Sequence, residues 1–406
     1  VTVSVLYCLR GKPFLWFSPP VRPTSPENML RRVVPTAVVP AAWRAAPFAS
    51  KLCVSDVFDK APDAFVRRHI GPKYSEAKAM LAAVDPELKT VDELMDKVVP
   101  KNIRRESWPE AEALTETEAL SNLRRLMMRN KLRKSFIGQG YYDVILPPAI
   151  QRNVLENPGW YTPYTPYQAE ISQGRLESLL NYQTAVTELT GMELANASLL
   201  DEATAAAEAV SASIGIQAQR RQKNRTKIFV DRRCFAASIE MIRSRIGDTN
   251  RAEIVVGDLA SECDPADPKL AAIVVQTPDR NGAIRDFSEL FAAAAKNGVI
   301  SCCATELLTC TTLKPPGEMG ADFVFGNGQR LGIPLGFGGP HPAFFACKEA
   351  HKRFLPGRII GVSIDSKGRR ALRMALQTRE QHIKRANATS NICTAQALLA
   401  NMAAFY

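Results

Sequence analysis

The sequence predicts an α/β fold in which a mostly parallel sheet carries helices on both faces. Short apolar runs recur through residues 191–370, at 227–230, 254–256, 271–275, 299–304, 321–325 and 343–347. Segments with helical periodicity separate or follow several of these runs, at 234–244, 287–297 and 348–355. Strands that alternate with helices form parallel sheets, and a strand buried on both faces is apolar along its whole length. We therefore expect 191–370 to be a large α/β domain.

Residues 61–190 have a helical pattern instead, which predicts an amino-terminal arm of helices and loops. Apolar residues recur with helical spacing near 62–69, 74–83, 91–98 and 110–130. In the last of these segments Glu116 and Glu118 precede Arg124 and Arg125, the order that complements a helix dipole. A longer helix then runs to about Gly191, and its apolar stripe comprises Leu176, Leu179, Leu180, Ala185, Val186 and Leu189.

Composition and charge exclude several classes of protein. The chain has 406 residues, 46% of them apolar, and no apolar run reaches the length of a membrane span. The net charge is +11, but residues 1–60 hold eight lysines and arginines against three acids. The remaining charge is too dispersed to form a nucleic-acid surface. Nine cysteines without a CxxC pair or metal-like spacing predict reduced thiols and no metal site.

Residues 1–60 are predicted to be a disordered leader and, from Met29, a mitochondrial transit peptide. Residues 28–55 contain no acid, and their basic residues are Arg31, Arg32, Arg44 and Lys51. An acid-free segment with scattered arginines among serine, alanine and proline is typical of mitochondrial targeting. A weakly basic disordered tail, or an upstream mistranslation, is the alternative. The targeting interpretation places the protein in the mitochondrial matrix.

The loop that follows Asn157 is crowded with aromatic residues and prolines. They are Pro158, Trp160, Tyr161, Pro163, Tyr164, Pro166 and Tyr167. Prolines restrict the backbone, and aromatic side chains offer large adhesive surfaces. We expect this loop to form a wall of a binding cleft or a subunit contact, rather than a simple connection.

Residues 371–406 are predicted to begin a carboxy-terminal segment, with a basic strand-and-loop stretch and then a helix. Ser390 is a suitable cap for that helix, and the apolar stripe comprises Ile392, Ala395, Leu398, Leu399 and Met402. No stop signal precedes Tyr406. We therefore expect the segment to be truncated or covered by a partner.

The stretch Asn157–Ala209 closely resembles the glycine decarboxylase, or P-protein, of the glycine cleavage system. Further shared stretches are Arg67–Pro72, Gly138–Tyr142, Gln329–Pro340 and Gln377–Thr394. The resemblance covers 61–406 and corresponds to the amino-terminal half of that protein. It implies an aspartate-aminotransferase-like fold (PLP-dependent transferase fold type I) with an amino-terminal helical arm. Departures from the family pattern are Gln139, Asn327-Gly328 and Phe235, which stands where a histidine is common.

The resemblance also implies a function in glycine catabolism. In this family the two halves share one fold, only the carboxy-terminal half binds pyridoxal phosphate (PLP), and some bacteria make the halves as separate subunits. The complete enzyme, glycine dehydrogenase (decarboxylating), decarboxylates glycine and transfers its aminomethyl group to the lipoyl group of the H-protein. The expected partners are therefore glycine, a PLP-binding carboxy-terminal half or subunit, and lipoylated H-protein. A non-catalytic scaffold or regulatory relative is the alternative.

The residues themselves indicate that this chain does not hold PLP. The cofactor needs a lysine for a Schiff base, an acid for its pyridine nitrogen and a helix amino terminus for its phosphate. Arg330 occupies the lysine-like position, and a guanidinium cannot form a Schiff base. Cys303 and Ala304 stand where the acid would end a strand, and Asp201-Glu202 would repel a phosphate at the helix start. A free-standing PLP enzyme is therefore disfavoured, and no catalytic residue is expected in this chain alone.

Several polar side chains are candidates for a contribution in trans to the active site of the other half. The candidates are Tyr141, Tyr142, Tyr164, Thr165, Tyr167, Gln168, Arg379 and His382. Tyrosine hydroxyls and a glutamine amide orient a substrate without titrating near neutral pH, and an arginine binds a carboxylate. Packed interface tyrosines, and a structural ion-pair cluster around Arg379 and His382, are the alternatives.

Overall fold

The computed structural model describes residues 71–104, 107, 114–162, 166–376 and 396–406. The chain divides into two compact units, Val1–Lys131 and Leu132–Tyr406. In the first unit the described helices are α3 (Tyr74–Val84), α4 (Val91–Val98) and α5 (Glu116–Met127). The side chains of Thr90 and Thr115 cap α4 and α5. These helices confirm the segments predicted near 74–83, 91–98 and 110–130, whereas 62–69 lies outside the described residues.

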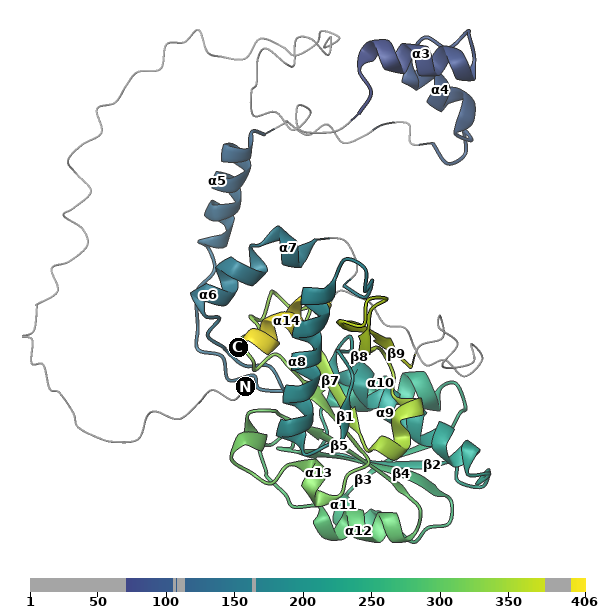
Figure 1. Ribbon diagram of the computed structural model, residues 1–406, viewed down its shortest axis with the longest axis vertical. Coiled ribbons are helices and arrows are strands. Elements are labelled where there is room, and N and C mark those ends of the chain that lie inside the picture. The colour runs from purple at the N-terminus through teal and green to yellow at the C-terminus, as the bar shows by residue number, and fades with distance from the viewer. Residues whose placement is uncertain (1–70, 105–106, 108–113, 163–165, 377–395) are drawn as a thin grey trace, which may run out of the picture. The chain divides into compact units, whose positions relative to one another are not determined.

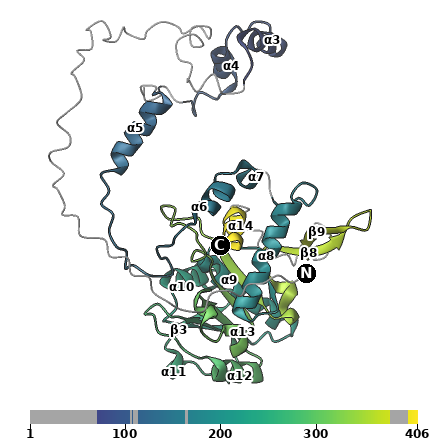
Figure 2. The ribbon, with the colours of Figure 1, turned by 60° about the vertical axis from the view of Figure 1, so that its left-hand side comes forward.

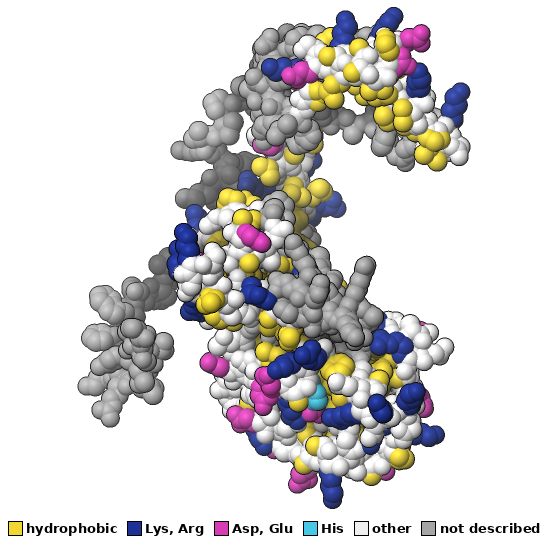
Figure 3. Space-filling model, turned by 45° about the vertical axis from the view of Figure 1, so that its right-hand side comes forward, with side chains coloured by type: hydrophobic (Ala, Val, Ile, Leu, Met, Phe, Trp, Pro, Cys, Tyr) yellow, Lys and Arg dark blue, Asp and Glu magenta, His cyan; other side chains and the backbone are white. Residues whose placement is uncertain are grey.

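Helices α3 and α4 expose much of their apolar surface (Figure 3). Their exposed apolar residues are Met80, Val84, Val91, Met95 and Val98. Amphipathic helices of a globular protein usually bury such residues. The sequence pattern therefore placed these helices correctly, but it gave no indication of what they contact.

The second unit is built on a seven-stranded sheet (Figure 1). The strands lie in the order β1-β7-β6-β5-β4-β2-β3, and those from β3 to β6 run parallel. β7 is antiparallel to both of its neighbours, β6 and β1. The bounds are β1 Leu194–Ala195, β2 Lys227–Asp231, β3 Glu253–Gly257, β4 Leu270–Thr277, β5 Ile300–Thr305, β6 Phe323–Asn327 and β7 Ala343–Cys347. All six predicted strands are present, and the prediction of a mostly parallel sheet is confirmed.

The helices cover both faces of this sheet (Figures 1 and 2). They are α8 (Gln173–Thr190), α9 (Glu202–Gln219), α10 (Ala236–Ile242) and α12 (Ser288–Lys296). Ile273 and Val275 of β4 pack in the same core cluster as α8 and α12, whereas Ala272 and Val274 pack with α9 and α10. Alternate residues of one strand thus serve two cores, which explains the uninterrupted apolar runs in the sequence.

The remaining helical elements of the unit are short or terminal. They are α6 (Pro148–Ile150), α7 (Pro158–Tyr161), α11 (Leu259–Glu262), α13 (Pro316–Met319), α14 (Gln396–Phe405), π-helical turns at Gln151–Leu155 and Arg243–Gly247, and 3-10 turns at Thr309–Thr311 and Glu349–Phe354. α14 packs against α8. The predicted cap Ser390 and the stripe residues Ile392 and Ala395 lie outside the described residues. None of the helices described is long and apolar enough to cross a membrane.

A separate antiparallel hairpin, β8 (Ile359–Ile364) and β9 (Arg370–Ala375), lies against α8. Two glutamines of α8 hold the hairpin through hydrogen bonds with the backbone of its strands. Gln183 accepts from Ile360 N at 2.7 Å and donates to Ile360 O at 3.2 Å. Gln173 makes the same pair of bonds with Leu372, at 2.8 and 2.9 Å. The sequence pattern indicated a strand only at the start of 371–406.

Candidate functional site

A cavity of about 430 Å³ opens at the carboxyl ends of β4, β5 and β6, beside the amino terminus of α9. We call it the sheet-end cavity. It is lined by Phe136, Ile137, Gly138, Gln139, Gly140, Tyr142, Glu202, Phe235, Gln276, Pro278, Asp279, Arg280, Gly282, Thr305, Glu306, Thr309, Asn327 and Arg330. In α/β folds with parallel strands, ligands bind at this edge of the sheet.

A larger groove, of about 830 Å³, lies elsewhere in the unit. Its lining includes Trp160 and Phe405, whose rings pack edge to face with centroids 5.2 Å apart. Gly159 and Trp160 of the aromatic loop line this groove, and the role of the loop in a binding cleft or a subunit contact stays a prediction. However, the groove lies away from the strand ends, and its lining includes exposed residues such as Ile171 and Glu177. We take the sheet-end cavity as the candidate site because charged groups of several elements converge there.

The amino terminus of α9 presents a carboxyl group to the sheet-end cavity. Asp201 caps the helix and accepts a hydrogen bond from Thr204 N at 2.7 Å. Glu202 follows as the first helical residue and is only 8% exposed. Burial, and then the charge of Asp201, raise the pKa of Glu202 to about 8. Glu202 is therefore mostly protonated at neutral pH, and its proton is held where the helix dipole alone would favour an anion.

The opposite wall follows β6 and is held to the loop 136–142 by Gln329. This side chain is fully buried; it accepts from Tyr142 N at 3.3 Å and donates to Tyr142 O at 2.8 Å. The next residue, Arg330, places its guanidinium over the Tyr142 ring, 4.5 Å from the centroid. Arg330 Nε also lies 3.5 Å from Glu306 Oε1. Two neighbouring residues thus fix a loop that precedes them by 187 positions.

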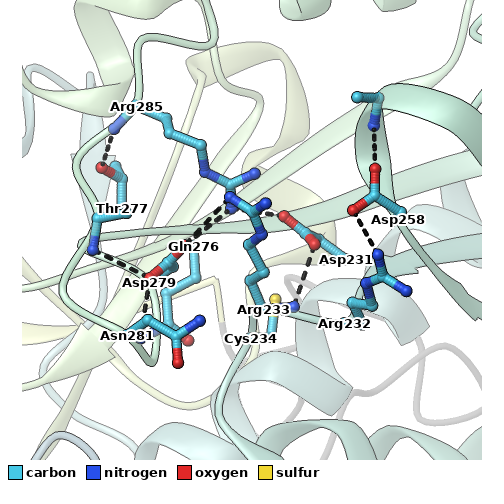
Figure 4. Close-up of polar contacts among 12 residues, drawn as sticks. Asp231, Arg232, Arg233, Cys234, Asp258, Gln276, Thr277, Asp279, Asn281 and Arg285 are labelled. Atoms are coloured by element: carbon cyan, nitrogen blue, oxygen red, sulfur yellow. Dashed lines mark hydrogen bonds and ion pairs between the residues drawn. The ribbon is translucent and has the colours of Figure 1, made fainter.

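A cluster of ion pairs lies at the ends of β2 and β4 (Figure 4). Arg285 donates to Asp231 Oδ2 at 2.5 Å and lies 3.7 Å from Asp279 Oδ2. Arg233 approaches the same Asp279 oxygen to 3.9 Å. Both aspartates are buried, so each charge needs these partners to offset its desolvation. Asp279 belongs to both the cluster and the lining of the sheet-end cavity.

The structure describes four of the eight predicted site residues, and only one of them lines the sheet-end cavity. Tyr142 is that residue. Tyr141 stands beside it and packs on His341, with ring centroids 5.0 Å apart. The Tyr167 ring lies under the guanidinium of Arg358 at 4.4 Å, and Gln168 is half-buried near it in the chain. Tyr164, Thr165, Arg379 and His382 lie outside the described residues.

Sequence reasoning missed several residues of the site. Glu202 was identified, but Gln276, Asp279, Glu306 and Gln329 were not recognised as neighbours of it. The strand expected to end at Ala304 continues to Thr305, and Glu306 follows it directly. An acid therefore does stand at this strand end, contrary to the expectation from Cys303 and Ala304. The available signal was positional, because each missed residue lies within two positions of a strand end.

The lining does not fit PLP. Among the described residues of the sheet-end cavity there is no lysine, and Arg330 is engaged with Tyr142 and Glu306. The carboxyl of Glu202 occupies the helix start where a phosphate would need backbone donors and positive potential. Glu306 accepts hydrogen bonds from Leu308 N and Thr309 N at 3.1 Å, which ties it to the turn after β5.

The fold places this chain among the PLP-dependent transferases of fold type I, the aspartate-aminotransferase-like class. A crystal structure of glycine decarboxylase (P-protein) of the glycine cleavage system, in inhibitor-bound form, matches it with a TM-score of 0.73 and 36% identity. The match covers 83% of this chain and 76% of that chain. Residues 67–406 match the family described as glycine cleavage system P-protein, and the chain belongs to that family.

Curated relatives that match most of this chain are glycine dehydrogenases (decarboxylating). Glycine dehydrogenase (decarboxylating) of Vibrio parahaemolyticus is 52% identical over 344 residues, which is 84% of this chain and 35% of the relative. The mitochondrial glycine dehydrogenase (decarboxylating) of Gallus gallus is 50% identical over 355 residues, 87% of this chain and 34% of the relative. The chain thus spans about a third of the length of these relatives.

Proposed function

We propose that this chain is the amino-terminal half, or subunit, of a glycine dehydrogenase (decarboxylating), with the PLP-binding half supplied elsewhere. The observation that carries the proposal is the family match over 67–406 combined with a cavity whose described lining has no lysine and does not fit PLP. The solved P-protein chain, of which this chain covers 76%, is of comparable length. A P-protein chain of this size therefore has a precedent.

In this proposal the chain contributes surface and orientation, whereas the other half supplies the electron sink of PLP. Glycine would be decarboxylated there, and its aminomethyl group passed to the lipoyl group of an H-protein. Tyr141, Tyr142, Tyr164, Thr165, Tyr167, Gln168, Arg379 and His382 are the proposed contributors in trans. Tyr141 and Tyr142 are 39% and 38% exposed, so both remain accessible to a partner. Their hydroxyls would orient bound substrate rather than transfer protons.

The decisive experiment is reconstitution with the PLP-binding half and lipoylated H-protein. Release of labelled carbon dioxide from carboxyl-labelled glycine should require both halves. Tyr141→Phe and Tyr167→Phe should each lower turnover by about ten- to a hundredfold, the effect of one hydroxyl contact made in the transition state. Assembly should not change, since phenylalanine keeps the ring contacts with His341 and Arg358.

Tyr161→Phe is the matched control, because Tyr161 is half-exposed and outside the proposed set. Wild-type turnover in both test variants would make these tyrosines packing residues. Full activity of the PLP-binding half alone would favour the non-catalytic scaffold. Purified chain mixed with PLP and reduced by borohydride should retain no lysine-linked cofactor. A stoichiometric adduct would overturn the assignment of this half.

We also propose that the protein acts in the mitochondrial matrix, directed there by the segment from Met29 to about residue 55. The composition of that segment supports the proposal, since it carries four basic residues and no acid. Both mitochondrial and bacterial relatives match the chain. Import of a fused reporter is therefore the direct test.

A further inference from the structure

The turn 335–341 is closed on itself and fixed against the loop 136–142. The carbonyl oxygen of Leu335 accepts hydrogen bonds from the backbone nitrogens of two glycines of the turn, at 2.9 and 3.1 Å. His341 Nε2 lies 3.1 Å from the same oxygen. The His341 ring also packs on Tyr141 of the loop, with centroids 5.0 Å apart. The turn therefore has a defined conformation beside the sheet-end cavity.

Phe337, within this turn, combines two unfavourable features. Its φ is +59°, in the left-handed region, and its side chain is 95% exposed. A left-handed backbone is unfavourable for a bulky side chain, whereas glycine, which stands on both sides of Phe337, adopts it freely. Almost nothing in the described chain covers the ring to offset this strain. Such an outlier indicates that the side chain meets something outside the chain.

Further apolar side chains continue from the turn along the mouth of the sheet-end cavity. Phe136 is 90% exposed and Ile137 is 79% exposed, and both line the cavity together with Tyr142. Tyr141 connects them to the turn through its ring contact with the histidine. The rim patch, as we call this surface, comprises Phe136, Ile137, Tyr141, Tyr142 and Phe337. Contiguous exposed apolar patches mark contacts with other macromolecules.

We propose that the rim patch is the docking surface for the PLP-binding half, with Phe337 as its anchor. This inference rests on the proposed function. Tyr142 belongs both to the rim patch and to the lining of the sheet-end cavity, so a half docked here would face residues proposed to act in trans. Aromatic side chains in fully desolvated pockets dominate the binding energy of many interfaces. Phe337 would enter such an apolar socket on the other half.

The charge beside the rim patch defines the partner further. Residues 132–142 contain Arg133 and Lys134 but no acid, and both basic side chains are exposed. Two copies of the chain paired through the patch would bring these like charges into one interface, which disfavours a second copy as the occupant. A socket bordered by acidic residues would attract them instead. Association with the PLP-binding half should therefore slow as the salt concentration rises.

The test measures binding of the full chain to the PLP-binding half by surface plasmon resonance. Phe337→Asn removes the ring but keeps the turn, because asparagine tolerates a left-handed backbone. It should raise the Kd by about 30-fold or more, the loss expected for a hot-spot aromatic residue. The melting temperature of the chain alone should not fall, since the ring is 95% exposed. Lys134→Glu should slow association and weaken its dependence on salt.

Ile364→Asn and Lys367→Glu make the same kinds of change on the hairpin β8–β9, where both side chains are exposed, and should bind like the unaltered chain. Failure of the unaltered chain to bind the PLP-binding half would refute the proposed function itself. Unaltered affinity of Phe337→Asn, or equal weakening by Ile364→Asn, would overturn only the docking surface. A dimer of the chain alone that Phe337→Asn dissociates in analytical ultracentrifugation would overturn it as well, because a second copy would then occupy the rim patch.

Discussion

Replacing Gln329 with leucine tests whether one buried side chain holds the loop 136–142 in place. Leucine has a similar volume but no polar atoms, so the change removes hydrogen bonds without opening a large cavity. The lost bonds are those with Tyr142 N and O, and a further donation to Ile333 O at 2.8 Å. The hydrogen bond from Gln329 N to Asn327 Oδ1 remains, because it uses the backbone.

The magnitude follows from which partners water can reach. Tyr142 is 38% exposed, so water can replace the two bonds to its backbone, at a net loss of about 0.5–1.5 kcal/mol for each bond. Ile333 is buried, and an unsatisfied carbonyl there costs about 1–3 kcal/mol. Added together, these losses predict that Gln329→Leu lowers the free energy of unfolding by about 2–6 kcal/mol.

Urea unfolding measures that loss, and amide hydrogen exchange at Tyr142 measures the freedom of the loop. The matched control is Gln183→Leu, which breaks two equivalent bonds to Ile360 in the hairpin. It should destabilise the protein while leaving exchange at Tyr142 unchanged. If Gln329→Leu unfolds at the same urea concentration as the unaltered chain, or leaves exchange at Tyr142 slow, the glutamine is not the anchor of the loop.

Three further predictions concern pH, packing and targeting. Because the folded-state pKa of Glu202 is raised from 4.5 to about 8, its contribution to stability is complete below pH 4.5 and is lost as pH rises to 8. The stability of Glu202→Gln relative to the unaltered chain should therefore increase as pH rises through this window. An equal difference in the free energy of unfolding between the two proteins at pH 5 and at pH 8 would contradict this. A Cβ at Gly326 would lie 2.0 Å from Thr305 O, so Gly326→Ala should cost on the order of 4 kcal/mol or prevent folding. Gly174→Ala, where nothing lies within 4 Å, is the control and should be neutral or mildly stabilising in circular-dichroism melts. Finally, residues 1–55 should direct a fluorescent reporter into mitochondria, and a cytosolic reporter would show that they form a tail without targeting function.

The fold class and the positions of most elements could be predicted from the amino-acid pattern alone. Periodicity is a local property, so an apolar run such as 271–275 indicates a strand that is buried on both faces wherever its neighbours lie. Helix α4 was placed at its observed bounds for the same reason, and the structure adds a capping box that Thr90 and Glu93 form within the segment itself. Strand β9 was predicted at the start of 371–406, whereas β8 escaped prediction, because its backbone partners are β9 and Gln183 of α8, which lies 177 positions from Ile360 in the chain.

Which residues share a site could not be predicted in this way, because it depends on how distant parts of the chain pack together. Arg330 was recognisable as a substitution for lysine, but its stacking on Tyr142 depends on a loop 188 positions away in the chain, anchored by the adjacent Gln329. The convergence of Glu202, Asp279 and Asn327 depends on the order and register of β4, β5 and β6, which sequence spacing does not encode. Strand ends meet at one edge because the strands are parallel, so the site is set by topology, whereas the chemistry of each wall is set by the residues that follow each strand.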